Sequence, residues 1–154
     1  MNYYSPSNWL KLPEFNIAIF SFLLSFFWEI QQMWFYQTPA GYSHLDIVRN
    51  CTLATVGDVV ILLIAFWAVA VLSKSRHWLR YPSRSQMSVF ILVGVVITVV
   101  IEAFATGPLN RWIYAESMPT IPILGTGLVP LSMWFLVPPL TIWFARRQML
   151  SDRY

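Results

Sequence analysis

The chain has 154 residues, of which 57% are hydrophobic, 17% are aromatic and only 11% are charged. A soluble domain carries about 25% charged residues and leaves roughly a third of its unfolded surface in water at this length, so this composition excludes an ordinary soluble fold. The net charge of +3 does not indicate a nucleic-acid partner, because the basic residues flank apolar stretches. We therefore expect a single membrane domain over residues 1–154.

The first apolar stretch covers about residues 15–36, which meets the requirement of about 20 residues per membrane crossing. It is too long for the apolar core of a signal peptide, and Glu29 interrupts it, so we do not predict cleavage. Its polar side chains recur at steps of three and four residues, which predicts one polar face on a helix: Ser21, Ser25, Glu29, Gln32 and Tyr36.

The second and third spans are predicted at about residues 51–72 and 87–105. Each of them also carries a narrow polar stripe at helical spacing. The stripe of the second span is Cys51, Thr55 and Asp58, and that of the third is Gly94, Thr98, Glu102 and Thr106. Such stripes should face one another or a watery cavity, because polar side chains avoid hydrocarbon.

A loop over residues 107–127 follows, rich in proline and glycine, and leads into a fourth span at about residues 128–145. Irregular backbone cannot face lipid without partners for its amides, so we expect this loop to cap the outer mouth of a four-helix bundle. The side chains of Arg111, Trp112 and Tyr114 would then lie near the carboxyls of the predicted spans. The tandem Pro138 and Pro139 predict a bend in the last span.

The connections predict the orientation of the chain. Eight of the ten basic residues lie in the two tails and in the middle connection, while the other two connections hold only Arg49 and Arg111. The excess of positive charge on the cytoplasmic side predicts that both termini are cytoplasmic. We expect an integral protein of a bacterial inner membrane.

Three carboxyls lie inside predicted spans, and a charged side chain costs roughly 2.5–3.5 kcal/mol at the centre of a spanning helix. At 1.5 Å per residue, all three fall in the outer half of the membrane. We interpret Glu29, Asp58 and Glu102 as one catalytic site, in which Glu29 and Asp58 handle the proton and Glu102 and Arg111 tune them. The side chains expected to contact a ligand are Gln32, Tyr36, Thr55, Thr98, Arg111, Trp112 and Tyr114.

No cofactor or metal is expected. The single cysteine, Cys51, excludes an internal disulfide and any multi-cysteine metal site. His44 and Asp46 in the first outer connection match no standard metal motif, and the phosphate-binding, dinucleotide-binding and hydrolase motifs are absent from the sequence.

Three functions fit this pattern. The first is an intramembrane enzyme that does acid/base chemistry of the isomerase or cyclase type on an apolar or isoprenoid-like lipid. The second is an accessory subunit of a larger membrane complex, or a homo-oligomer. The third is cation or proton translocation, although Val89 to Ile97 offers almost no polar stepping stone across the inner half.

Overall fold

The computed structural model describes residues 10–150, and in this part of the chain four α-helices are long and apolar enough to cross a membrane, with no β-strand. The prediction of an all-helical protein with four spans is confirmed. The helices are α1 (Pro13–Gln32), α2 (His44–Leu72), α3 (Arg84–Thr106) and α4 (Leu128–Leu150), and two short 3-10 helices are η2 (Met33–Phe35) and η3 (Arg76–Arg80).

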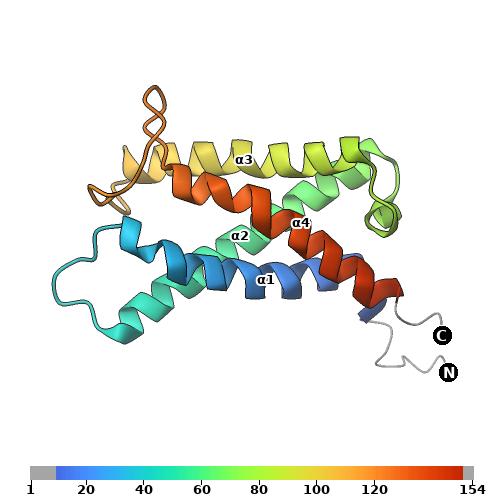
Figure 1. The fold of residues 1–154 in the computed structure, drawn as a ribbon, viewed down its shortest axis with the longest axis horizontal. Helices are drawn as coiled ribbons and strands as arrows, with labels where there is room; N and C mark the ends of the chain where they lie inside the picture. Colours follow the sequence, from blue (N-terminus) through green and yellow to red (C-terminus); the bar gives the residue numbers. More distant parts are fainter. Residues whose placement is uncertain (1–9, 151–154) are drawn as a thin grey trace.

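Successive helices run in opposite directions (Figure 1), so that the start of α1 and the end of α4 lie at the same end of the bundle as η3. We call this the terminal end. The connections 36–43 and 107–127 lie at the opposite end, which we call the loop end. α1 packs against α2 and α4, and α3 packs against the same two helices. The loop end therefore brings together the end of α1, the start of α2, the end of α3 and the start of α4.

Helices α2 and α3 begin earlier than their apolar stretches, because each starts with a capping box. The Ser43 side chain accepts a hydrogen bond from the Asp46 amide, and Asp46 Oδ2 accepts one from the Ser43 amide at 2.9 Å. Ser83 and Gln86 form the same reciprocal pair at the start of α3. These polar first turns satisfy backbone amides that lack helical partners, and hydropathy alone does not detect them.

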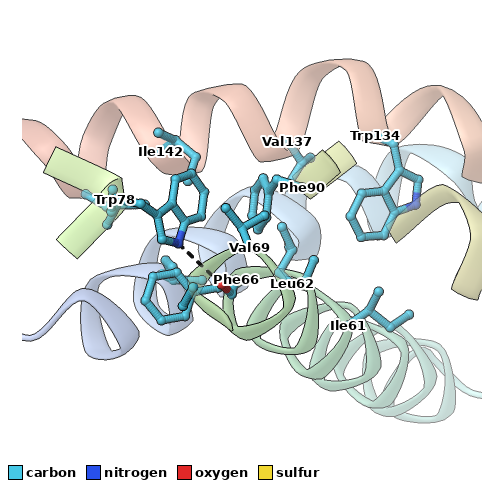
Figure 2. Packing of buried hydrophobic residues seen from close by; sticks show 14 of the residues in the cluster. Ile61, Leu62, Phe66, Val69, Trp78, Phe90, Trp134, Val137 and Ile142 are labelled. Atoms are coloured by element: carbon cyan, nitrogen blue, oxygen red, sulfur yellow. Dashed lines mark hydrogen bonds between the residues drawn. The ribbon is translucent and has the colours of Figure 1, made fainter. Parts of the chain in front are cut away.

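The hydrophobic core fills the bundle from its middle toward the terminal end. Figure 2 shows the indole of Trp78 from η3 donating a hydrogen bond to the Phe66 carbonyl of α2, at 3.3 Å. The Trp78 ring centroid lies 5.8 Å from that of Phe66 and 5.6 Å from that of Phe90 on α3. All three side chains are buried, so aromatic rings occupy this half of the interior.

The polar stripes face the interior, and large apolar side chains such as Leu23, Phe27 and Phe135 face outward. This is the reverse of a soluble bundle and suits a lipid surrounding. Eight members of the stripes are buried: Ser21, Ser25, Gln32, Cys51, Thr55, Gly94, Thr98 and Glu102. The spans thus bring their polar groups into one interior.

Candidate functional site

The three carboxyls come from three helices. Glu29 lies near the end of α1, Asp58 lies near the middle of α2 and Glu102 lies in the last turns of α3. Glu102 is 6% exposed, whereas Glu29 and Asp58 are partly buried. Glu29 and Glu102 both lie within electrostatic reach of Asp58, and Glu102 lies within that of Glu29. The structure therefore brings these residues into one electrostatically connected group.

Glu102 is the hydrogen-bond acceptor at the centre of the loop end. Its Oε1 accepts a bond from the Tyr36 hydroxyl at 3.4 Å, and its Oε2 accepts bonds from Trp112 Nε1 at 3.2 Å and from the Tyr114 hydroxyl. All three donors sit on aromatic rings. A carboxyl group with this many donors is fixed in position and presented as an acceptor.

The Tyr114 hydroxyl also accepts a hydrogen bond, from the Gly127 amide at 3.0 Å. Tyr114 lies in the connection between α3 and α4, outside the spanning helices. Burial raises the pKa of this tyrosine above its ordinary value, and the hydrogen bond to Glu102 raises that pKa further. The phenol is therefore held as a donor toward Glu102 over a wide pH range.

Backbone pairing between the end of α1 and the loop sets the positions of the two tyrosines. Tyr36 and Tyr114 form an antiparallel bridge, in which the Gln37 amide donates to the Ile113 carbonyl at 2.8 Å and the Ala115 amide donates to the Phe35 carbonyl at 2.9 Å. The two tyrosine rings lie 5.5 Å apart between centroids. The bridge therefore places the hydroxyls of Tyr36, which precedes Glu102 in the chain, and of Tyr114, which follows it, within hydrogen-bonding distance of the Glu102 carboxyl.

Glu29 belongs to a chain of side chains along α1. Gln32 Nε2 donates to Glu29 Oε1 at 2.6 Å, and Gln32 Oε1 accepts a bond from Trp28 Nε1 at 3.1 Å. The spacing of three and four residues places all of them on one side of the helix. Gln32 is buried, and its side-chain amide bonds to both the Trp28 indole and the Glu29 carboxyl. It therefore fixes the position of the carboxyl relative to the indole.

Asp58 differs from Glu102 because its buried Oδ2 has no hydrogen-bond partner among the described residues. Ser25 of α1 interacts with the Asp58 carboxyl, yet neither Ser25 Oγ nor Asp58 Oδ2 has a partner in hydrogen-bonding geometry among the described residues. Ser25 is fully buried. A buried polar pair with unused capacity is costly unless it serves a purpose.

Three of the predicted ligand contacts do not reach the carboxyls. The Thr55 hydroxyl donates to the Cys51 carbonyl of its own helix at 2.8 Å, and the Thr98 hydroxyl accepts a bond from Trp134 Nε1 at 2.9 Å. Arg111 is exposed, and its guanidinium forms no ion pair with another described residue. Gln32, Tyr36, Trp112 and Tyr114 do contact an acid.

Sequence reasoning did not identify the contacts of Ser25, Trp28 and the Gly127 amide. A signal existed for Ser25, which precedes Glu29 by four residues on the polar stripe, and for Trp28, which precedes Gln32 by the same step. Nothing local marks the Gly127 amide, because its partner Tyr114 lies across a loop.

Within residues 10–150 no three His, Cys, Asp or Glu side chains are arranged to hold a metal ion. Two surface grooves, of about 240 and 320 Å³, lie away from the acids. Residues of α2 and α3 near Val69 and Gln86 line one of them, and residues of α1 and α4 near Phe20 and Phe144 line the other.

Comparisons with family models, with curated proteins and with solved structures each found no match to this chain. The four apolar helices indicate an integral membrane protein.

Proposed function

We propose that this protein binds an apolar, isoprenoid-like lipid at its loop end and moves protons on and off that lipid, in chemistry of the isomerase or cyclase type. The observation that carries the proposal is the Glu102 carboxyl, which accepts hydrogen bonds from Tyr36, Trp112 and Tyr114 while Glu29 and Asp58 lie within its electrostatic reach. Carboxyls inside a membrane protein mark functional sites by default.

The three acids take different roles in this proposal. Asp58 and Glu29 handle the proton, because Asp58 Oδ2 has no partner in hydrogen-bonding geometry within residues 10–150, and within that range Gln32 is the side chain that donates to Glu29. Glu102 is a positioning residue that holds the aromatic side chains of the loop end together. The ring faces of Trp28 and Tyr36 are suited to stabilise a developing cation.

The reaction balances without an oxidant or a reductant. A protonated carboxyl gives its proton to one carbon of a double bond, the π electron pair forms the new C–H bond, and the neighbouring carbon becomes a cation. A carboxylate then removes a proton from an adjacent carbon, and that C–H electron pair forms the new double bond. In a cyclase, a second double bond attacks the cation before this proton is lost. Proton transfer of this kind contributes about 10²–10⁴-fold to rate.

The core argues against ion passage through one copy of the chain. Phe66, Trp78 and Phe90 are buried and pack ring against ring in the terminal half of the bundle, where a translocation path would need polar groups or water. Glu102 and its donors Tyr36, Trp112 and Tyr114 lie in the other half. This arrangement supports chemistry at one end of the bundle over transport along it.

We also propose that the loop end faces away from the cytoplasm of a bacterium and that residues 107–127 cover the site. The distribution of basic residues supports this orientation, since eight of ten lie in the tails and the connection between α2 and α3. Trp112 and Tyr114 of this loop contact Glu102, which supports a cover.

The test uses Glu29→Gln, Asp58→Asn and Glu102→Gln, together with Glu116→Gln as a matched control on an exposed loop carboxyl. Each purified protein is reconstituted in vesicles that contain a mixture of polyprenyl and carotenoid hydrocarbons, and the lipids are separated by chromatography and mass spectrometry. We expect wild type and Glu116→Gln to convert one lipid to an isomer of equal mass. The Glu29 and Asp58 variants should lose about 100-fold or more of this activity.

Equal conversion by all variants would refute the role of the acids, and no conversion by wild type of any lipid in the mixture would refute this substrate class. Purification in mild detergent tests the accessory-subunit alternative directly. Recovery of the wild-type chain only within a larger complex of other proteins would favour that alternative over an enzyme that acts alone.

A further inference from the structure

The segment 119–127 forms a small hairpin at the loop end. Thr120 and Gly127 form an antiparallel bridge. The Ile121 amide donates to the Thr126 carbonyl at 2.9 Å, and the Gly125 amide donates to the Ile121 carbonyl at 2.8 Å. Gly125 has φ +66°, a conformation that favours glycine. In Figure 1 the hairpin projects away from the bundle, across the direction of the helices.

The tip of this hairpin is apolar and exposed. Ile123 is 94% exposed and Leu124 is 55% exposed, and no charged residue occurs from 117 to 145. Hairpin tips in water are dominated by Gly, Asn, Asp and Ser, which bond to the local backbone or to solvent. An uncharged tip that presents isoleucine and leucine side by side indicates an apolar partner.

The backbone of the hairpin is suited to the boundary of a bilayer. Pro119 and Pro122 have no amide hydrogen to satisfy, and the amides of Ile121, Gly125 and Leu128 bond within the hairpin and its base. The Ile123 and Leu124 amides have no partner among the described residues. They would be costly in the hydrocarbon centre and acceptable at the level of the headgroups.

We infer that the hairpin 119–127 inserts its Ile123–Leu124 tip into the interfacial layer of the surrounding bilayer, with phospholipid as its partner. The hairpin leads directly into α4, whose exposed side chains include Leu128 and Phe135. A hairpin that projects across the helix direction lies parallel to the membrane plane, as interfacial elements do. The inference does not rest on the proposed function.

Insertion of the tip would anchor the cover of the site. The Gly127 amide at the base of the hairpin donates to the Tyr114 hydroxyl, and Met118 is buried there. Its sulfur would lie 2.9 Å from a Cβ placed on Gly127. Tyr114 donates in turn to Glu102. The lipid contact is therefore two hydrogen bonds away from a carboxyl of the site.

The test labels single cysteines in the full chain. In a Cys51→Ala background, Ile123→Cys and, separately, Leu124→Cys carry an environment-sensitive fluorophore, and the proteins are reconstituted in phosphatidylcholine vesicles. One set of vesicles has acyl chains brominated near the headgroup, and a second set receives aqueous iodide. Leu53→Cys on the exposed face of α2 is the lipid control, and Thr38→Cys on the exposed connection 36–43 is the water control.

We expect brominated lipid to remove most of the fluorescence at positions 123 and 124, as at position 53, and iodide to remove little. Iodide quenching equal to that at position 38, with no effect of brominated lipid, would place the tip in water and overturn the inference. Protection of both positions from both quenchers would also overturn it, because a protein surface would then cover the tip. Each labelled variant must elute and melt like its Cys51→Ala parent, and two adjacent labels keep the test valid if one variant fails.

Discussion

The indole of Trp134 on α4 lies directly against Gly94 on α3, so closely that a Cβ on residue 94 would stand 1.9 Å from the ring. The ring is fully buried, and its Nε1 donates to the Thr98 hydroxyl one turn further along α3. Glycine is therefore required at position 94 by close packing, since only a residue without a side chain leaves room for the indole.

Gly94→Ala should destabilise the protein by about 1–3 kcal/mol, because the buried indole must move to admit one methyl group. The matched control is Gly57→Ala on α2, where a Cβ would meet nothing within 4 Å. Thermal unfolding in detergent micelles measures both variants. A melting temperature that falls equally in both, or in neither, would contradict this account of Gly94.

The Trp134–Thr98 hydrogen bond should contribute a small coupling energy. A double-mutant cycle with Thr98→Val and Trp134→Phe is expected to give about 0.6 kcal/mol and no more than about 1.7 kcal/mol, as for other hydrogen bonds between membrane helices. Most of the cost of Trp134→Phe should instead come from lost packing. Additive effects of the two substitutions would show that the bond does not contribute.

Tyr114→Phe should cost about 1–3 kcal/mol of stability, because it removes the donor to Glu102 and leaves the Gly127 amide without its acceptor. Tyr42→Phe, at an exposed tyrosine of the connection 36–43, is the control and should be neutral. Chemical unfolding in mixed micelles gives both values. A neutral Tyr114→Phe would mean that the loop does not depend on this hydroxyl.

The contribution of the Tyr114 hydroxyl to stability should depend on pH. Burial raises its pKa in the folded protein above the ordinary value of 10.0, so the unfolded chain loses this proton first as pH rises. The stabilising contribution is therefore fully present below pH 10.0 and is lost as pH rises toward the pKa of the folded protein. The stability difference between wild type and Tyr114→Phe should be constant below this pH and shrink above it.

Melting curves at a series of pH values measure that difference, and tyrosinate absorbance follows the ionisation itself. A difference that stays constant through alkaline pH would indicate that the Tyr114 hydroxyl ionises equally well in the folded and unfolded chains. Tyr42→Phe again serves as the control, because its side chain is exposed.

Hydropathy and helical spacing predicted the four spans and the inward direction of the polar stripes. Both rest on local patterns, since the cost of polar groups in lipid acts on each helix separately. The starts of α2 and α3 were predicted too late because Ser43 and Ser83 cap polar first turns. α4 continues to Leu150, five residues beyond the predicted end of the span at 145. Hydropathy marks the apolar part of a helix, whereas the helix itself extends into the polar residues that follow.

The contacts of the site were harder to predict. The sequence placed Tyr36, Trp112 and Tyr114 near the acids, but it could not show that all three donate to Glu102. The sequence placed Thr98 among the ligand contacts, and in the structure its hydroxyl accepts a hydrogen bond from Trp134 of α4. Such pairings depend on how the helices rotate and cross, which the local pattern of residues along one helix does not determine.

The bridge between Tyr36 and Tyr114 has a consequence for how the protein is made. Tyr36 and Glu102 are 66 positions apart in the chain, and Tyr114 follows later still. During synthesis, Glu29 and Asp58 enter the membrane with the first two helices, before any of the aromatic donors of the loop exists. The hydrogen-bonded centre of the loop end therefore cannot form until the third helix, which carries Glu102, and the following loop, which carries Trp112 and Tyr114, have both left the ribosome.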